Sequence, residues 1–157
     1  MKLKAKIDQV LENILIALMS ILVIDVLWQV LSRYILSSPS SFTDELAGFL
    51  LIWVGVLGAA YVAGRQEHLS IDLLVQRSAP ATSKKLKIVI NFFIGLFALF
   101  VMIVGGIWLV ATRFMFNVDS AALHLPLGYV YIVLPISGIL ILYYSILFII
   151  KPEGGQA

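Results

Sequence analysis

Four long apolar runs dominate the 157-residue sequence, at residues 11–36, 46–64, 88–112 and 126–150. Each run is long enough to cross a bilayer, because a helix needs about 20 apolar residues to span the hydrocarbon layer. Hydrophobic residues make up 61% of the chain and charged residues only 13%, which leaves too little polar surface for a soluble domain. The sequence therefore predicts an all-α integral membrane protein with four transmembrane helices in a single domain, residues 1–157.

Basic residues mark one side of this predicted membrane domain. Nine of the 11 Lys and Arg residues precede the first run, separate the second from the third, or follow the fourth. Because Lys and Arg gather in short cytoplasmic segments, both termini are expected in the cytoplasm. The loops at residues 37–45 and 113–125 then face outwards, which in a bacterial inner membrane means the periplasm.

The longest connection, between the second and third runs, begins with the mixed segment HLSIDLLVQRSA at residues 68–79. Its mixture of apolar and polar residues predicts a short amphipathic helix lying in the membrane interface, ended by Pro80. An ordinary amphipathic linker is the alternative. His68 and Asp72 would touch on such a helix, either as a subunit contact or as a solvated pair.

The first run carries Asp25, Gln29 and Arg33 at four-residue spacing, so these side chains share one stripe of the helix. Ionisable groups at membrane depth are costly and need partners. For Asp25 a polar contact with another helix or subunit is favoured over a proton or cation relay, because no second deep carboxylate accompanies it. Trp28 is interpreted as a packing residue in the same part of the helix.

After the polar bend, Ser41 and Asp44 resemble an N-terminal capping arrangement for the second helix. Asp44 and Glu45 also suit the positive end of the helix dipole. We expect one carboxylate to cap the helix and the other to pair with Arg33 across the hairpin. A substrate-facing role for either carboxylate is the less favoured alternative.

Small residues in the last three runs predict close helix packing, because helix backbones approach each other where side chains are small. Proline in the last run predicts a kink. The residues concerned are Gly55, Ala59 and Ala63, the neighbouring pair Ala60 and Gly64, then Gly105, Gly106, Pro135, Ser137 and Gly138.

Catalytic and cofactor chemistry finds little support in the sequence. Cysteine is absent, and both histidines lie outside the four runs, which disfavours a membrane anchor that binds haem. No metal-binding HExxH motif, nucleophile elbow or glycine-rich phosphate loop occurs. The net charge of +2 offers no basic face for nucleic acid. We therefore expect no enzyme activity, no catalytic or metal site and no cofactor in this chain.

Several short segments resemble the small membrane subunit, or Q subunit, of tripartite ATP-independent periplasmic (TRAP) transporters. The resemblance extends over nearly the whole chain, and the order and spacing of the segments carry it. They are Arg33–Tyr34, Thr43–Ala47, Leu57–Ala60, His68–Asp72 and Pro126–Tyr129, with Pro135 in the last run.

This resemblance implies a scaffold subunit without a substrate site of its own. In such systems a periplasmic protein binds an organic acid, and a large membrane subunit holds the substrate and sodium sites. The small subunit packs against the large one in the bilayer, and its outer loops are candidates for docking the binding protein. Asp25, Trp28, Gln29, Arg33, Asp44, Glu45, His68 and Asp72 are then the candidate structural or subunit-contact residues.

Two other transport functions stay open on the sequence. A self-contained four-helix proton-coupled transporter would use a deep carboxylate such as Asp25. The small subunit of another tripartite system, the tripartite tricarboxylate transporters, has a similar architecture, and the segments named above favour the TRAP assignment over it.

Overall fold

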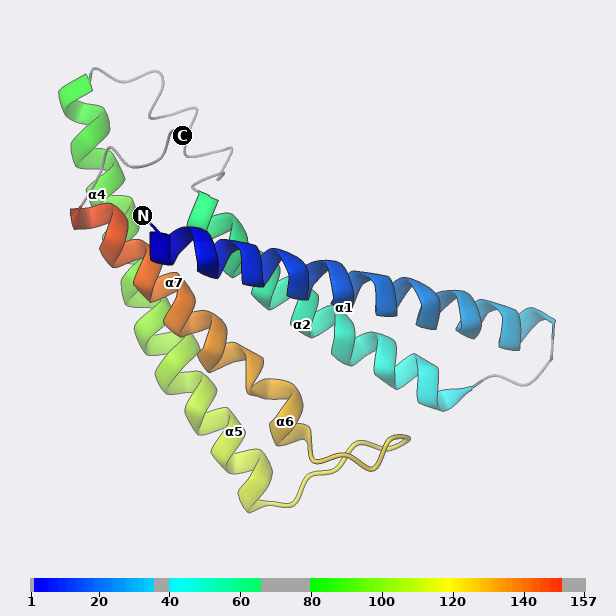
Figure 1. Ribbon diagram of the computed structural model, residues 1–157. Helices are drawn as coiled ribbons and strands as arrows, with labels where there is room; N and C mark the ends of the chain where they lie inside the picture. The colour runs from blue at the N-terminus through cyan, green and yellow to red at the C-terminus, as the bar shows by residue number, and fades with distance from the viewer. Residues whose placement is uncertain (1, 36–39, 66–79, 151–157) are drawn as a thin grey trace. The chain divides into compact units, whose positions relative to one another are not determined.

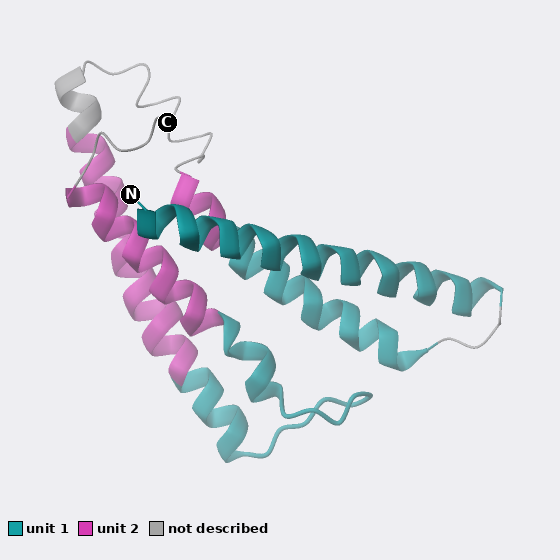
Figure 2. Cartoon of the chain, in the orientation of Figure 1, with its two compact units in different colours: residues 1–58, 108–133 teal, residues 59–107, 134–157 magenta. Residues whose placement is uncertain are grey.

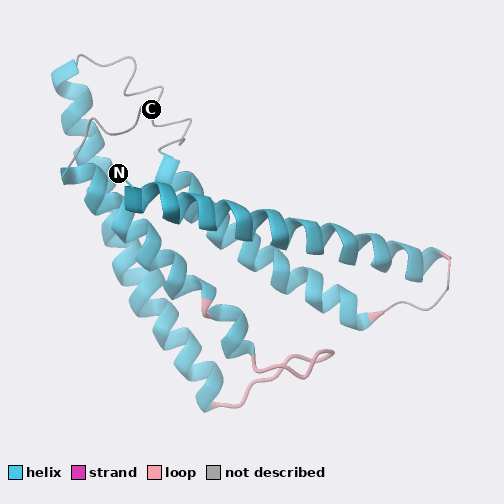
Figure 3. Cartoon of the chain, viewed as in Figure 1, coloured by secondary structure: helices cyan, strands magenta, loops and turns pink. Residues whose placement is uncertain are grey.

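The computed structural model describes residues 2–35, 40–65 and 80–150, and this part of the chain is helical apart from short connections (Figures 1 and 3). The helices are α1 (Lys2–Tyr34), α2 (Ser41–Arg65), α4 (Pro80–Phe97), the π-helix η1 (Ala98–Gly105), α5 (Gly106–Met115), α6 (Leu127–Tyr131) and α7 (Val133–Ile150).

Among the described residues, four helical segments are long and apolar enough to cross a membrane, which confirms the predicted all-α class with four spans. They are Lys2–Tyr34, Ser41–Arg65, Lys85–Met115 and Leu127–Ile150. The first helix begins earlier than the apolar run, and an ion pair between Lys4 and Asp8 at 2.9 Å supports its polar first turns. The predicted interfacial helix at residues 68–79 lies outside the described residues.

The chain divides into two compact units, coloured separately in Figure 2. Unit 1 comprises residues 1–58 and 108–133, and unit 2 comprises residues 59–107 and 134–157. Unit 1 contains the α1–α2 bend and the connection from α5 to α6. Unit 2 contains most of the third and fourth spans.

In unit 1, α1 buries a single narrow seam. From Leu11 onwards its buried and half-buried positions recur at alternating intervals of four and three residues, the spacing of a coiled-coil seam. The first half of this seam is leucine and its second half is polar, while the remaining faces of α1 expose apolar side chains. The seam residues are Leu11, Leu15, Leu18, Leu22, Asp25, Gln29 and Ser32.

Unit 1 also joins α2 to the last span. The Trp53 indole Nε1 donates a hydrogen bond to the Val130 carbonyl in α6 at 3.0 Å. Gly128 lies against the Phe114 ring, where a Cβ would come within 2.5 Å of the ring. The last span breaks at Ile132, between α6 and α7. Pro135 has no N–H to bond the carbonyl four residues earlier, which accounts for a break near the predicted kink.

In unit 2 the third and fourth spans pack closely through small residues. The third span buries Gly95, Ala98, Met102 and Gly106 on one face. A Cβ on Gly106 would lie 3.0 Å from Pro135 Cδ, and one on Gly138 would lie 2.8 Å from Met102 Cβ. The predicted packing role of these two glycines is confirmed. The π-helical turns of η1, which lie in this contact, have no signature in the sequence pattern.

The second span takes part in the same unit through its last turns. Ala60 is fully buried, and Gly64 faces the ring of Tyr144, whose exposed fraction is 1%. A Cβ on Gly55, in contrast, would meet no heavy atom within 4 Å, and Ala59 is exposed. Of the two small-residue patterns on α2, the one formed by Ala60 and Gly64 is therefore used inside this chain.

Candidate functional site

Polar side chains gather at the end of unit 1 where α1 and α2 meet. Gln29 of α1 donates a side-chain hydrogen bond to Oδ1 of Asp44 in the first turn of α2. The Ser32 hydroxyl donates to the Gln29 carbonyl at 2.9 Å, within the same helix. Gln29 therefore joins the polar half of the α1 seam to α2, while the Ser32 hydroxyl bonds within α1.

The start of α2 is capped by a different residue from the one predicted. Ser40 Oγ accepts a hydrogen bond from the Thr43 N–H at 3.5 Å, and the Thr43 hydroxyl donates to the Ser40 carbonyl at 3.0 Å. The cap lies one residue before Ser41 because the helix begins at Ser41 itself. Asp44 is consequently free to reach across to α1.

The pairing expected for Arg33 is wrong. Arg33 forms no ion pair or hydrogen bond with a described residue. The two carboxylates expected to compete for it take other donors, since Asp44 accepts from Gln29 and Glu45 accepts from backbone amides. The Gln29 amide occupies Oδ1 of Asp44 without the entropy cost of ordering a long guanidinium side chain.

Glu45 connects the start of α2 to the loop that joins α5 to α6. Its Oε1 accepts a hydrogen bond from the Ala121 N–H at 3.0 Å. Its Oε2 accepts from the Ala122 and Leu123 N–H groups, each at 2.8 Å. Three successive backbone donors on one carboxylate form an anion-binding nest, and such charge-assisted bonds are stronger than neutral ones.

The loop that carries this nest is folded on itself. The Ser120 N–H donates to the Leu125 carbonyl at 2.9 Å, and the Leu127 N–H donates to the Val118 carbonyl at the same distance. Asn117 and His124 adopt positive φ values of 46° and 50°, a conformation in which asparagine and histidine are enriched. Glu45 therefore holds a structured loop against α2.

Asp25 is the deepest ionisable group of the α1 seam. Its exposed fraction is 7%, and its Oδ2 accepts no hydrogen bond from a described residue. A buried, unpaired carboxylate oxygen at membrane depth is costly. Its burial on the seam agrees with a contact between helices, while the choice between contact and relay stays a prediction.

The remaining sequence candidates fall in different places. Trp28 lies on the exposed side of α1, with an exposed fraction of 54%, and does not join the seam. His68 and Asp72 lie outside the described residues. Within the described ranges, no group of three His, Cys, Asp or Glu residues is placed to hold a metal ion.

Sequence reasoning missed the residues that complete these contacts. The amides of Ala121, Ala122 and Leu123 carry no side-chain signal, and their partner is 76 to 78 residues away. Ser40 was the one detectable omission, because serine directly before a helix start is a strong capping signal.

Comparison with known proteins gives a consistent result. Residues 22–152 match the family model described as the DctQ component of tripartite ATP-independent periplasmic transporters. A Haemophilus influenzae protein provisionally named a TRAP transporter small permease protein is 29% identical over 137 residues, which cover 86% of this chain and 82% of that protein. The Vibrio cholerae sialic acid TRAP transporter small permease protein SiaQ is 29% identical over 97 residues, covering 59% of this chain and 56% of SiaQ.

A third similarity is confined to a short segment. The sialic acid TRAP transporter permease protein SiaT of another Haemophilus influenzae strain is 44% identical over 46 residues. These residues cover 29% of this chain but only 8% of SiaT. The matched segment is thus a small part of a much longer permease protein.

Proposed function

Because the chain belongs to the DctQ family of tripartite ATP-independent periplasmic transporter components, we propose that this small permease subunit is a scaffold for sodium-coupled uptake of an organic acid. It is a multi-pass membrane protein and a transporter subunit, not an enzyme. In the proposed assembly the substrate and sodium sites belong to the large permease, and this chain packs against it in the bilayer.

The use of polar groups in unit 1 supports a scaffold. Gln29 and Asp44 join α1 to α2, Glu45 holds the loop, and Trp53 bonds the α6 backbone. These groups satisfy one another or the backbone, so they fix helices in place rather than converge on a transported ion. The Glu45 contact carries most weight, because one carboxylate takes three backbone donors.

Large exposed apolar surfaces leave room for a membrane partner as well as lipid. Outside its seam, α1 exposes aliphatic side chains along most of its length, and the third span exposes several aromatic ones. The tripartite system implies a large permease and a periplasmic binding protein as partners. The SiaT similarity supports association with a large permease, since a segment like this one occurs within a longer permease protein.

We also propose that the loop held by Glu45 faces the periplasm, where it can contact the binding protein, and that both termini are cytoplasmic. The charge distribution supports this orientation in the inner membrane. The chain contains no cysteine, so single cysteines can be introduced without background. Asp119 in the loop and Lys6 near the start of α1 are both exposed.

Labelling with a membrane-impermeant maleimide tests the orientation. Asp119→Cys should react in cells whose outer membrane is permeabilised and whose inner membrane is intact. Lys6→Cys should react only after the inner membrane is disrupted. The readout is the fraction of protein that gains a maleimide-linked mass. Labelling of Lys6→Cys, but not of Asp119→Cys, while the inner membrane is intact would refute the proposed topology.

Co-purification and reconstitution test the scaffold function. The tagged full chain should retain a much larger membrane protein through detergent purification. Reconstituted alone in liposomes with a sodium gradient or a proton gradient, it should take up neither radiolabelled sialic acid nor succinate. Uptake by the isolated chain would refute the scaffold function. The second candidate function is a self-contained proton-coupled transporter, which the unpaired Asp25 oxygen favours. Uptake by the isolated chain that is lost in the Asp25→Asn variant would support this second function.

A further inference from the structure

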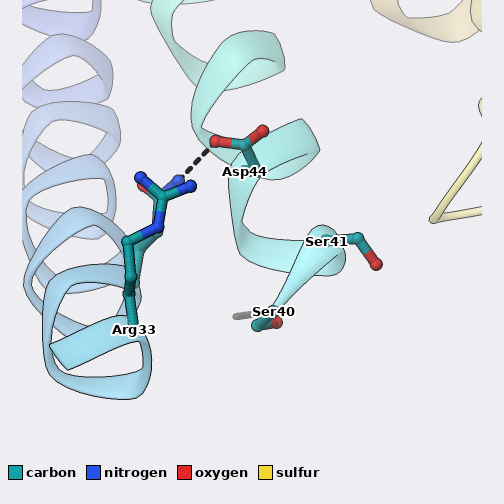
Figure 4. A pocket seen from close by; sticks show the side chains of 5 residues that line it. Arg33, Ser40, Ser41 and Asp44 are labelled. Carbon is teal, nitrogen blue, oxygen red and sulfur yellow. Dashed lines mark hydrogen bonds between the residues drawn. The ribbon is translucent and has the colours of Figure 1, made fainter. Parts of the chain in front are cut away.

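A pocket lies between the end of α1 and the start of α2, within unit 1. Its volume is about 260 Å³, and it is lined by Gln29, Arg33, Ser40, Ser41 and Asp44 (Figure 4). All five lining side chains are polar. The volume is below the ~300–1,000 Å³ typical of sites for whole small molecules, so the pocket suits a small polar group attached to something larger.

The pocket presents one positive and one negative group that do not neutralise each other. Arg33 forms no ion pair with Asp44, so no guanidinium nitrogen lies within 4.0 Å of its carboxylate oxygens. Asp44 engages Gln29 through Oδ1, and its Oδ2 forms no hydrogen bond with a described residue. A guanidinium and a carboxylate oxygen are therefore both available in one cavity.

This pair of charges selects among ligand classes. A simple anion would be attracted by Arg33 but repelled by the negative charge of Asp44. A metal cation would be attracted by Asp44 but repelled by Arg33. A zwitterion with a phosphate and a primary ammonium satisfies both groups. Guanidinium matches phosphate geometry with two parallel hydrogen bonds, and the ammonium donates to a carboxylate.

The surroundings of the pocket are those of a membrane interface. Tyr34 and Trp28 flank Arg33 on α1 with exposed fractions of 77% and 54%, and such aromatic side chains gather at headgroup depth. Towards the centre of the helix, α1 exposes Val26, Leu27 and Val30. A polar pocket bordered by this apolar surface suits a molecule with a charged head and hydrocarbon tails.

We propose that the cavity formed by Arg33, Asp44, Gln29, Ser40 and Ser41 binds the headgroup of an aminophospholipid such as phosphatidylethanolamine. Arg33 holds the phosphate, the Oδ2 atom of Asp44 accepts from the ammonium, and the acyl chains lie along the exposed aliphatic face of α1. Phosphatidylcholine lacks the N–H donors and phosphatidylglycerol lacks the positive charge, so both should bind less tightly.

Native mass spectrometry of the full chain tests this site. Delipidated protein in detergent is titrated with phosphatidylethanolamine, phosphatidylcholine and phosphatidylglycerol of equal chain length. The wild-type chain should retain the first lipid at roughly tenfold lower concentration than either of the others. Equal retention of the three lipids would overturn the proposal.

Substitutions separate the two charges. Arg33→Ala should weaken the retention of all three lipids, because each carries a phosphate, and Arg33→Lys should restore part of it. Asp44→Asn should remove the preference over phosphatidylcholine and move phosphatidylglycerol ahead of both. The Asp44→Asn result is a change in the order in which one variant retains the three lipids. It therefore tests the site even if the Arg33→Ala variant fails to fold.

Two controls match these substitutions in charge. Lys6→Ala removes an exposed cation from the other end of α1, and Asp119→Asn removes an exposed carboxylate outside the pocket. Neither should change the order of lipids, and a change with either would refute the pocket as the site. Soluble phosphoethanolamine that bound as tightly as the lipid would exclude a role for the acyl chains and overturn the lipid assignment.

Discussion

Replacing Gly64 with alanine is expected to destabilise the chain, although alanine is the better helix former. A Cβ at this position would lie 2.7 Å from Cζ and 2.9 Å from Cε2 of Tyr144, closer than carbon atoms pack. Tyr144 is almost fully buried and cannot easily move away. Overpacking of this kind costs roughly 1–3 kcal/mol, whereas the gain in helix propensity returns at most about 1 kcal/mol.

The same helix supplies a matched control. A Cβ on Gly55 meets no heavy atom within 4 Å, so Gly55→Ala should leave the stability of the isolated chain unchanged or slightly raised. The measurement is the loss of helical circular dichroism as sodium dodecyl sulfate displaces the detergent, recorded for both variants. Equal midpoints for Gly64→Ala and Gly55→Ala would contradict the close packing of α2 on α7.

A double-mutant cycle assigns the effect to Tyr144. In a Tyr144→Leu background the ring atoms that meet the new methyl group are absent, so Gly64→Ala should cost less than in the wild-type chain. Coupling between residues in contact is typically about 0.5–3 kcal/mol. A cost for Gly64→Ala that is the same in both backgrounds would place the strain elsewhere.

The spans were predictable because hydropathy acts over whole helices, while their ends depend on local contacts. The first helix extends to Lys2, with Lys4 paired to Asp8 in its first turns, and α2 begins at Ser41 with Ser40 as its cap. Which of the two small-residue patterns on α2 is buried depends on where Tyr144 of α7 packs against this helix. This packing is a tertiary contact, and the periodicity of the α2 sequence does not contain it.

The polar site was predicted in its location but not in its pairing. Of the predicted stripe of Asp25, Gln29 and Arg33, the first two lie in the α1 seam, whereas Arg33 is exposed and Ser32 takes the next seam position. Charge alone suggested that Arg33 would form an ion pair with a carboxylate. Instead, the Gln29 side-chain amide bonds one carboxylate, and backbone N–H groups bond the other. Backbone donors have no residue-specific signature, so a partner such as the Ala122 N–H could not be identified from sequence.

Glu45→Gln is expected to release the loop between α5 and α6 from α2. Glutamine keeps the length of the side chain but replaces one acceptor oxygen with an NH₂ group, which must face either the N–H of Ala121 or those of Ala122 and Leu123. Protection of the loop amides should fall, because at least one N–H loses its acceptor and the remaining hydrogen bonds lose their charge. Hydrogen–deuterium exchange of the loop peptide in the full chain should become faster by roughly tenfold or more.

The neighbouring carboxylate separates this local effect from a general loss of charge at the start of α2. Asp44→Asn removes the same charge one residue away, but the Asp44 side chain bonds only Gln29 among the described residues. It should therefore leave exchange at residues 121–123 unchanged. Faster exchange in both variants would show that charge at the helix start, rather than the hydrogen bonds of Glu45, orders the loop.

Uptake then connects the loop to the proposed docking function. In cells that contain the complete transporter, Glu45→Gln should lower uptake most when the periplasmic binding protein is scarce, because a displaced loop weakens its docking. Raising the amount of binding protein should recover most of the rate. The contrary result is an uptake defect that persists at saturating binding protein while the large permease still co-purifies. It would assign the loop to a step after docking, because substrate would then fail to pass through a transporter that is assembled and docked.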